Sequence, residues 1–323
     1  MLPNDIKTYN KQFEYEPVVE NAQKLKKYGS FLIVGMGGSH LAADLIRVWH
    51  PEIDLHIWSD YGLPKLADKD FKDRLVILSS YSGNTEEVID AFTAAKAKKL
   101  PIAVVAARGK LLTLAQKNKI PFVAIPDMKI QPRMETPRIL RGTLALMGEK
   151  LLLAETKLLV SSLHPLREEY RGKELARKLY GSTPVIYTSN QNGAVAYNWK
   201  IKFNETGKIP AFFNVVPELN HNEMTGFDAK AKTTGISRNF HFVFLKDGDD
   251  DRRIMKRMNV LEKLYRDRGF KTEVVLLQGK TRIAKIFNAL NLADWAAYHT
   301  AKMYGVDPEQ VPMVEEFKKL IAR

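Results

Sequence analysis

The residues whose types and spacing most clearly suit ligand binding are residues 80–85, Ser-Tyr-Ser-Gly-Asn-Thr. They follow an apolar run at residues 75–78 and precede a predicted helix over residues 86–97. A turn between a strand and a helix aims backbone N–H groups at one point, where the helix N-terminus adds partial positive charge. The alternative is a simple helix N-cap, but a cap uses one hydroxyl, whereas Ser80, Ser82 and Thr85 supply three. The stretch therefore predicts a phosphate site.

A glycine-rich turn, Gly35-Met36-Gly37-Gly38-Ser39, follows a second apolar run at residues 31–34. The dinucleotide-binding fingerprint G-x-G-x-x-G would need a glycine where His40 stands, which disfavours a nicotinamide cofactor. Glycines still let backbone N–H groups approach a ligand closely, and Ser39 adds a hydroxyl. This turn is therefore a second candidate for ligand contact.

Two arginines, Arg133 and Arg138, flank a connector that contains Pro132 and Pro137. A guanidinium in a rigid loop suits two roles, neutralising a developing oxyanion or pairing with a surface carboxylate. The sequence leaves both roles open.

Polar groups gather in two segments of the second half, residues 203–210, which contain Glu205, and residues 216–223, which contain His221 among carboxylates and amides. Each segment leaves a predicted helix or strand for a loop, where catalytic groups are common. A single His or Glu in such a place is more often structural. The density of polar groups beside the apolar run at residues 212–216 favours a functional role. Metal ligation is a further alternative, which no second cluster at ligand spacing supports.

The elements that must position these side chains alternate between strands and helices. Strand-length apolar runs occur at residues 31–34, 55–58, 75–78, 102–106 and 122–125. This alternation predicts α/β architecture, a parallel sheet with helices on both faces in three layers. Ligands of such sheets lie beyond the carboxyl ends of the strands. Residues 35–39, called here the glycine turn, and residues 80–85, called here the hydroxyl turn, both fall there. Helices are also predicted over residues 5–28 and 139–153.

The second half of the chain repeats the first. A strand, turn and helix over residues 184–204 follow the order of residues 31–49, and residues 241–277 follow the order of residues 75–106. The hydroxyl turn corresponds to an acidic run at residues 246–251, and carboxylates repel phosphate. We therefore predict two domains, residues 1–153 and 181–323, joined by a charged helical linker over residues 154–180. The anion should bind to the first domain alone.

Composition excludes several classes of protein. The chain has 323 residues, 45% of them hydrophobic, which suffices for two cores. Its net charge of +13 favours anionic partners, but the basic residues are scattered without a nucleic-acid-binding pattern. No apolar run approaches the ~20 residues of a membrane span, and no signal peptide is recognisable, so we expect no membrane contact and a cytoplasmic location. The absence of cysteine excludes disulfides, thiolate nucleophiles and cysteine-ligated zinc.

Taken together, these motifs resemble the bifunctional phosphoglucose/phosphomannose isomerase family, whose members have two sugar-isomerase (SIS) domains. The resemblance covers essentially the whole chain. The hydroxyl turn is typical of any SIS domain, whereas Glu-Leu-Asn-His-Asn-Glu at residues 218–223 is far more specific. Further matches are the glycine turn, Arg133, Glu205, and Val306-Asp307-Pro308 before Glu316-Phe317-Lys318.

The resemblance implies reversible aldose-ketose isomerisation of hexose 6-phosphates, in glycolysis and gluconeogenesis, without a metal or an organic cofactor. It also implies a homodimer in which His221 reaches the site of the other subunit. The implied phosphate-binding residues are Gly37, Gly38, Ser39, Ser80, Ser82 and Thr85. The implied catalytic residues are Glu205 as the base, Arg133 as the partner of the enediolate, His221 in ring opening and Lys318 at the sugar ring.

Two alternatives share the same motifs. One is an isomerase of another sugar phosphate, which would use the same phosphate-binding residues and the same enediol chemistry. The other is a non-catalytic SIS protein that only senses a sugar phosphate. A sensor would need neither a base nor an oxyanion partner, so Glu205, Arg133 and His221 argue for the enzyme.

Overall fold

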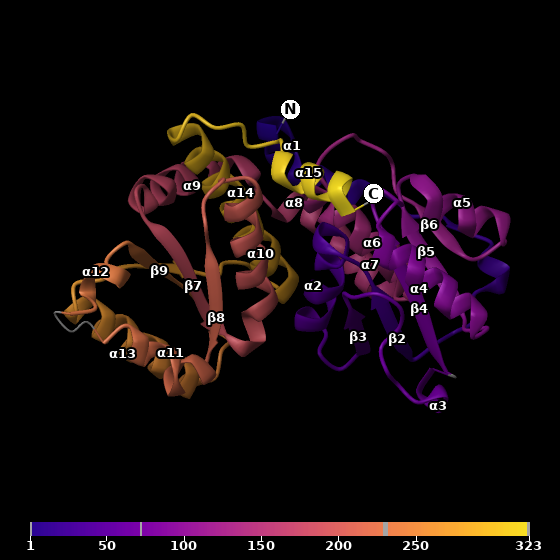
Figure 1. Ribbon diagram of the computed structural model, residues 1–323, viewed down its shortest axis with the longest axis horizontal. Helices are drawn as coiled ribbons and strands as arrows, with labels where there is room; N and C mark the ends of the chain where they lie inside the picture. The colour runs from indigo at the N-terminus through magenta and orange to yellow at the C-terminus, as the bar shows by residue number, and fades with distance from the viewer. Residues whose placement is uncertain (1, 72, 229–231, 322–323) are drawn as a thin grey trace. The chain divides into compact units, whose positions relative to one another are not determined.

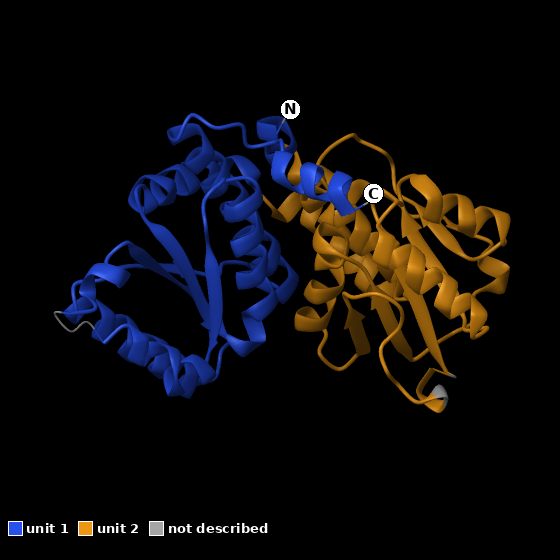
Figure 2. Ribbon diagram, in the orientation of Figure 1, with its two compact units in different colours: residues 1–7, 164–323 blue, residues 8–163 orange. Residues whose placement is uncertain are grey.

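The computed structural model describes residues 2–71, 73–228 and 232–321. It divides into two compact units (Figure 2), unit 2 with residues 8–163 and unit 1 with residues 1–7 and 164–323. The division falls inside the segment 154–180, which the sequence predicts as a linker, and the first seven residues belong with the second half of the chain. Each half of the chain thus builds its own hydrophobic core.

Unit 2 contains a six-stranded sheet in the order β1-β6-β5-β4-β2-β3 (Figure 1). Neighbouring strands are parallel, except that β1 runs antiparallel to β6. This confirms the predicted parallel α/β sheet. The strands are β1 (Val19–Glu20), β2 (Ser30–Val34), β3 (Asp54–Trp58), β4 (Arg74–Ser80), β5 (Ile102–Ala106) and β6 (Phe122–Ala124).

Helices cover both faces of this sheet, because its strands are apolar on both sides. Leu32, Val76 and Val104 point to one face and pack with the apolar side chains of α4 and α5. On the other face, Gly142 of α6 lies so close to Val123 that an added Cβ would be 3.2 Å from it. The helices of unit 2 are α2 (Leu41–Trp49), α3 (Asp68–Phe71), α4 (Glu86–Ala97), α5 (Gly109–Lys117), α6 (Thr136–Met147), α7 (Lys150–Lys157) and α8 (Leu159–Ser162).

Unit 1 contains a four-stranded, fully parallel sheet in the order β10-β9-β7-β8. Read from β8, this order reproduces the order β3-β2-β4-β5 of unit 2, which confirms the repeat predicted from the sequence. Unit 1 has no described counterpart of β6 and β1 in its sheet. The strands are β7 (Thr183–Ser189), β8 (Phe212–Val216), β9 (Phe240–Lys246) and β10 (Lys271–Leu276).

The helices of unit 1 also lie on two sides of the sheet. Phe242 and Phe244 of β9 face α13 together with Tyr187 of β7, in a cluster rich in aromatic rings. None of the helices in the described ranges is long and apolar enough to cross a membrane. The helices are α1 (Leu2–Lys7), α9 (Pro165–Leu179), α10 (Gly193–Glu205), α11 (Glu223–Gly226), α12 (Thr234–Ser237), α13 (Arg252–Asp267), α14 (Arg282–Met303) and α15 (Pro312–Ile321).

Two helix predictions are wrong, each for a local reason. Residues 5–28 form the short α1, two 3₁₀ turns and β1 instead of one helix, since Pro17 lacks an N–H and Asn21 adopts a left-handed φ of 56°. The helix predicted over residues 139–153 is split into α6 and α7, because Gly148 ends α6 with a φ of 79°.

In unit 1, α9 and α14 cross at Gly172, where an added Cβ would lie 2.4 Å from the Cβ of Trp295. We expect Gly172→Ala to lower the free energy of unfolding by about 1–3 kcal/mol, because the crossing has no room for a methyl group. Urea denaturation followed by circular dichroism measures this change. Gly235→Ala on α12, where nothing lies within 4 Å of the added Cβ, is the matched control. Equal stability of the two variants would contradict the tight crossing.

Candidate functional site

The hydroxyl turn begins inside the sheet, because β4 continues through Ser79 and Ser80 before the chain turns. The hydroxyls of Ser80 and Thr85 are 2.8 Å apart, and the backbone N–H of Gly83 donates to the Ser80 hydroxyl at 3.1 Å. Thr85 stands at the N-cap position of α4, but its side chain makes no capping bond. The capping alternative therefore does not account for this hydroxyl, which faces Ser80 across the turn.

Gly83 gives the turn its shape. Its φ is +69°, and an added Cβ would lie 1.7 Å from the carbonyl oxygen of Arg108. No other residue type fits this position without moving the backbone. The tight turn leaves Ser82 half-buried, with its hydroxyl accepting the N–H of Asn84 at 3.3 Å.

Ser39 joins the glycine turn to the hydroxyl turn. Its hydroxyl accepts the N–H of Tyr81 at 3.0 Å, and its carbonyl accepts the Ser79 hydroxyl at 2.8 Å. Ser39 closes the 3₁₀ turn Gly37–Ser39, in which Gly37 has a φ of +51°. The two turns found separately in the sequence are therefore held together beyond the ends of β2 and β4.

Arg133 belongs to the same part of unit 2. It lies in the 3₁₀ turn Pro132–Met134, which packs against Gly38 so closely that an added Cβ would be 2.8 Å from the Arg133 backbone nitrogen. The Arg133 side chain is buried. The neighbouring Arg138 pairs with Glu135 through two bonds of 2.8 and 2.9 Å. The carboxylate-pairing role left open by the sequence thus applies to Arg138.

Tyr81 is part of the hydroxyl turn, and its side chain is buried. Burial raises the pKa of Tyr81 to about 12, and the carboxylates of Glu135 and Asp127 act in the same direction. The phenol therefore keeps its proton at neutral pH and brings no negative charge to this edge of the sheet.

Glu205 is the last residue of α10 in unit 1, and two lysines hold this end of the helix. Lys202, one turn earlier, forms a buried ion pair of 2.6 Å with Asp294 of α14. Lys208 donates to the Glu205 carbonyl at 2.5 Å and also to the Gln310 carbonyl. The half-buried Glu205 is thus carried on a helix end with a defined position.

His221 and Lys318 come from two other elements of unit 1. His221 ends the 3₁₀ turn Glu218–His221 and is exposed. Lys318 lies on α15, where it is exposed and pairs with Glu315 at 3.0 Å. The structure therefore brings together the predicted residues of unit 2, namely Gly37, Gly38, Ser39, Ser80, Ser82, Thr85 and Arg133, and carries the predicted residues of unit 1 on three separate elements.

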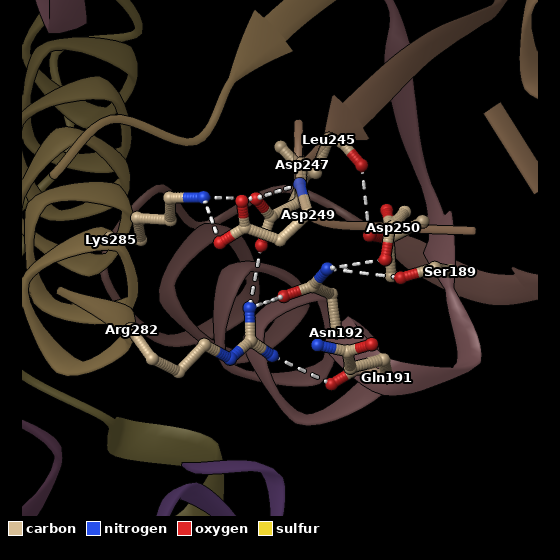
Figure 3. A network of polar contacts seen from close by, with 10 residues as sticks. Ser189, Gln191, Asn192, Leu245, Asp247, Asp249, Asp250, Arg282 and Lys285 are labelled. Carbon is tan, nitrogen blue, oxygen red and sulfur yellow. Dashed lines mark hydrogen bonds and ion pairs between the residues drawn. The ribbon is translucent and has the colours of Figure 1, made fainter. Parts of the chain in front are cut away.

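The acidic run of unit 1 occupies the place of the hydroxyl turn. Both loops span five residues between strand and helix, 81–85 before α4 and 247–251 before α13. Asp247 is fully buried, and its carboxylate binds Arg282 at 2.7 Å and Lys285 at 2.6 Å (Figure 3). Arg282 also donates to Asn192, which stands where the strand registers place Ser39 in unit 2.

This network was not predicted from the sequence, although two basic residues at the start of the last long helix, Arg282 and Lys285, were a visible signal. The carboxylate of Asp247 neutralises the charges of Arg282 and Lys285 within unit 1, and burial raises the pKa of the adjacent Asp250. Unit 1 thus has an internal anion where unit 2 has hydroxyls. Within the described ranges, no three His, Asp or Glu side chains gather in a way that could hold a metal ion.

Comparison with known proteins adds family information to this geometry. The model of the bacterial phospho-glucose isomerase C-terminal SIS domain matches residues 168–321. A bifunctional phosphoglucose/phosphomannose isomerase of Aquifex aeolicus is 30% identical, over 97% of this chain and 96% of the relative. The protein of the same name from Caldicellulosiruptor bescii is 31% identical, over 99% of this chain and 97% of the relative. A D-glucosamine-6-phosphate 4-epimerase of Sulfolobus acidocaldarius is 24% identical over 64% of this chain.

Solved structures share the fold at low sequence identity. The C-terminal domain of glucosamine-fructose-6-phosphate aminotransferase from Francisella tularensis superposes with a TM-score of 0.72 at 12% identity, covering 96% of each chain. A glucose-6-phosphate isomerase like protein from Thermus thermophilus has a TM-score of 0.58 at 18% identity, covering 88% of this chain and 87% of that one. These likenesses confirm the predicted α/β fold.

From the close contact between Gly38 and the 3₁₀ turn Pro132–Met134 we derive a prediction about anion binding. Gly38→Ala should push the Pro132–Arg133 backbone away and raise the Kd for inorganic phosphate about tenfold, equivalent to ~1.4 kcal/mol. Isothermal titration calorimetry measures this affinity. Gly29→Ala, where nothing lies within 4 Å of the added Cβ, should bind phosphate like the unmodified chain. Unchanged affinity in Gly38→Ala would show that the contact does not shape the anion site.

Proposed function

The chain belongs to the bifunctional phosphoglucose/phosphomannose isomerase family, and we propose that it interconverts glucose 6-phosphate and mannose 6-phosphate with fructose 6-phosphate. The observation that carries the proposal is that the similarity to these relatives runs through both units. The reaction moves one proton between C1 and C2 of the open-chain sugar through a cis-enediolate.

The phosphate is assigned to the carboxyl edge of the unit 2 sheet. The hydroxyls of Ser80, Ser82 and Thr85 surround one turn, and the helix end of α4 contributes partial positive charge there. Nothing lies within 4 Å of a Cβ added at Gly37, Gly38 packs against the Pro132–Arg133 backbone, and Ser39 joins the two turns. Binding the phosphate, which is remote from the reacting carbons, lets binding energy orient the sugar.

Glu205 is assigned the proton transfer. Its carboxylate takes the proton from C2 of the aldose and returns it to C1, while the hydroxyl proton passes from O2 to O1. Arg133 is assigned to the negative charge that develops on the enediolate oxygens, since a buried guanidinium interacts strongly with such a charge. The buried Lys202–Asp294 pair supports this role for Glu205 by fixing the end of α10.

His221 and Lys318 are assigned to ring opening and to contact with the sugar ring. The proposal includes a homodimer in which the partner's His221 reaches the substrate, and the exposure of His221 is compatible with such a role. A cytoplasmic location and a place in glycolysis and gluconeogenesis follow from the same assignment. No metal and no organic cofactor are required by this mechanism.

Proton NMR in heavy water tests the function. The purified protein is incubated with fructose 6-phosphate without added metal, and we expect glucose and mannose 6-phosphates that carry deuterium at C2. Glucose 6-phosphate alone would restrict the activity to one epimer. Absence of both products would contradict the proposal and favour an isomerase of another sugar phosphate or a non-catalytic sugar-phosphate-binding protein, which a screen of other phosphosugars would distinguish.

Replacement of the base separates binding from chemistry. Glu205→Gln should lower kcat by about 10³-fold, because the amide cannot accept the C2 proton. The Kd for inorganic phosphate should stay unchanged, since the phosphate residues lie on unit 2. Coupled spectrophotometric assays and calorimetry measure the two quantities. Glu174→Gln serves as the control, because Glu174 is a half-buried glutamate of α9 that pairs with Arg177. Full turnover by Glu205→Gln would remove Glu205 from the mechanism.

A further inference from the structure

His221 is presented by a short polar segment after β8, residues 217–226, called here the His221 loop. It contains the 3₁₀ turn Glu218–His221 and the single-turn helix α11. His221 itself is exposed, so its orientation depends on the residues around it. Two of these residues, Leu219 and Glu223, lie two positions before and two positions after it, and both are anchored.

Leu219 provides an apolar anchor. It is fully buried and packs in the core cluster that contains Tyr187 and Phe242. A buried leucine holds the first half of the loop against the sheet, but it does not fix the direction of the second half.

Glu223 provides a polar anchor on the other side of His221. Its carboxylate accepts the Tyr187 hydroxyl at 2.5 Å through one oxygen and the side-chain N–H of Asn214 through the other. Tyr187 comes from β7 and Asn214 from β8. One carboxylate therefore connects the loop to two adjacent strands.

Both donors are held in place before they meet Glu223. Tyr187 is fully buried, with its ring 5.5 Å from that of Phe242 and 5.7 Å from that of Phe244. Burial raises the pKa of the Tyr187 hydroxyl, which keeps its proton and remains a donor. The side-chain oxygen of Asn214 accepts the Val215 N–H at 2.8 Å, so that its NH₂ group is the part that faces Glu223.

The side chains of Asn220 and Asn222 make their described polar contacts within the loop. Asn222 donates to Glu218 at 2.8 Å and accepts the Glu223 N–H at 2.5 Å, and the Asn220 amide lies 3.9 Å from the sulfur of Met224. These contacts shape the loop but do not attach it to the strands. Glu223 makes that attachment through charge-assisted hydrogen bonds, which are stronger than neutral ones.

We propose that Glu223 is a positioning residue for the reaction, which holds the His221 loop on β7 and β8 so that the imidazole is oriented for ring opening. This inference rests on the proposed function, in particular on the role of His221. Ring opening breaks the C1–O5 bond, removes a proton from O1 and delivers one to O5, so it needs a correctly oriented acid–base group. Glu223 acts through His221 and touches no substrate atom.

Anomer exchange measures ring opening separately from isomerisation. Opening and closing of the ring interconverts α- and β-glucose 6-phosphate, and in Glu205→Gln only this exchange remains because proton transfer between carbons is blocked. Exchange NMR on this background gives the catalysed rate. Adding Glu223→Ala should lower that rate by about tenfold or more, while the Kd for inorganic phosphate stays that of the parent. A purely structural defect would instead lower the stability of unit 1, which urea denaturation followed by circular dichroism detects.

Two milder variants keep the test decisive if Glu223→Ala fails to fold. Glu223→Gln retains an acceptor for Tyr187 and should fall between the parent and the alanine variant. Tyr187→Phe removes one donor without altering the loop and should slow exchange about threefold, the size expected for one hydrogen bond. Glu273→Ala, a half-buried glutamate of β10 that pairs with Lys178 at 2.7 Å, is the matched control and should leave exchange unchanged.

His221→Ala separates failure of this inference from failure of the proposed function. If His221→Ala abolishes exchange and the Glu223 variants do not slow it, the positioning role is overturned and the proposed function stands. If His221→Ala leaves exchange unchanged, the role of His221 in ring opening is wrong, and the role of Glu223 falls with it. If His221→Ala abolishes exchange and the Glu223 variants slow it, with unchanged phosphate affinity, the inference is supported.

Discussion

The close approach of Gly38 to the Pro132–Arg133 backbone is the contact on which the arrangement of unit 2 depends. It brings the segment after β6 against the turn after β2, although the two are far apart in the sequence. Ser39, the next residue, then bonds both to Tyr81 and to Ser79 at the end of β4. A parallel sheet collects the carboxyl ends of its strands at one edge, and this chain of contacts joins three of those ends into one polar surface.

The two units share a strand order, but the loops that follow the equivalent strands β4 and β9 carry different side chains. In unit 2, β4 leads into a tight turn that carries hydroxyls, whereas in unit 1 β9 leads into a turn that carries carboxylates, of which Asp247 binds Arg282 and Lys285. The basic side chains of unit 1 are therefore engaged by Asp247, inside the protein. The two units share the strand order and the length of this loop, and they differ in the side chains that the loop carries.

Unit 1 instead holds its candidate catalytic groups through polar contacts between elements. The buried Lys202–Asp294 pair joins α10 to α14 beneath Glu205, and a buried charge that lost its partner would cost about 3–5 kcal/mol. Glu223 joins the His221 loop to β7 and β8. Such contacts are directional, so they define the orientation of a helix end or a loop more narrowly than apolar packing does.

Apolar runs and the turns between them are local properties, so the sequence alone was enough to predict the strands other than β1, the parallel α/β class, the repeat and the hydroxyl turn. Local signals were insufficient at residues 5–28, where Pro17 and Asn21 override the helical pattern. The binding of Asp247 to Arg282 and of Glu223 to Tyr187 became apparent only from the folded protein. Both contacts depend on which strand ends, loops and helix ends become neighbours, and folding decides this through contacts between residues distant in the chain.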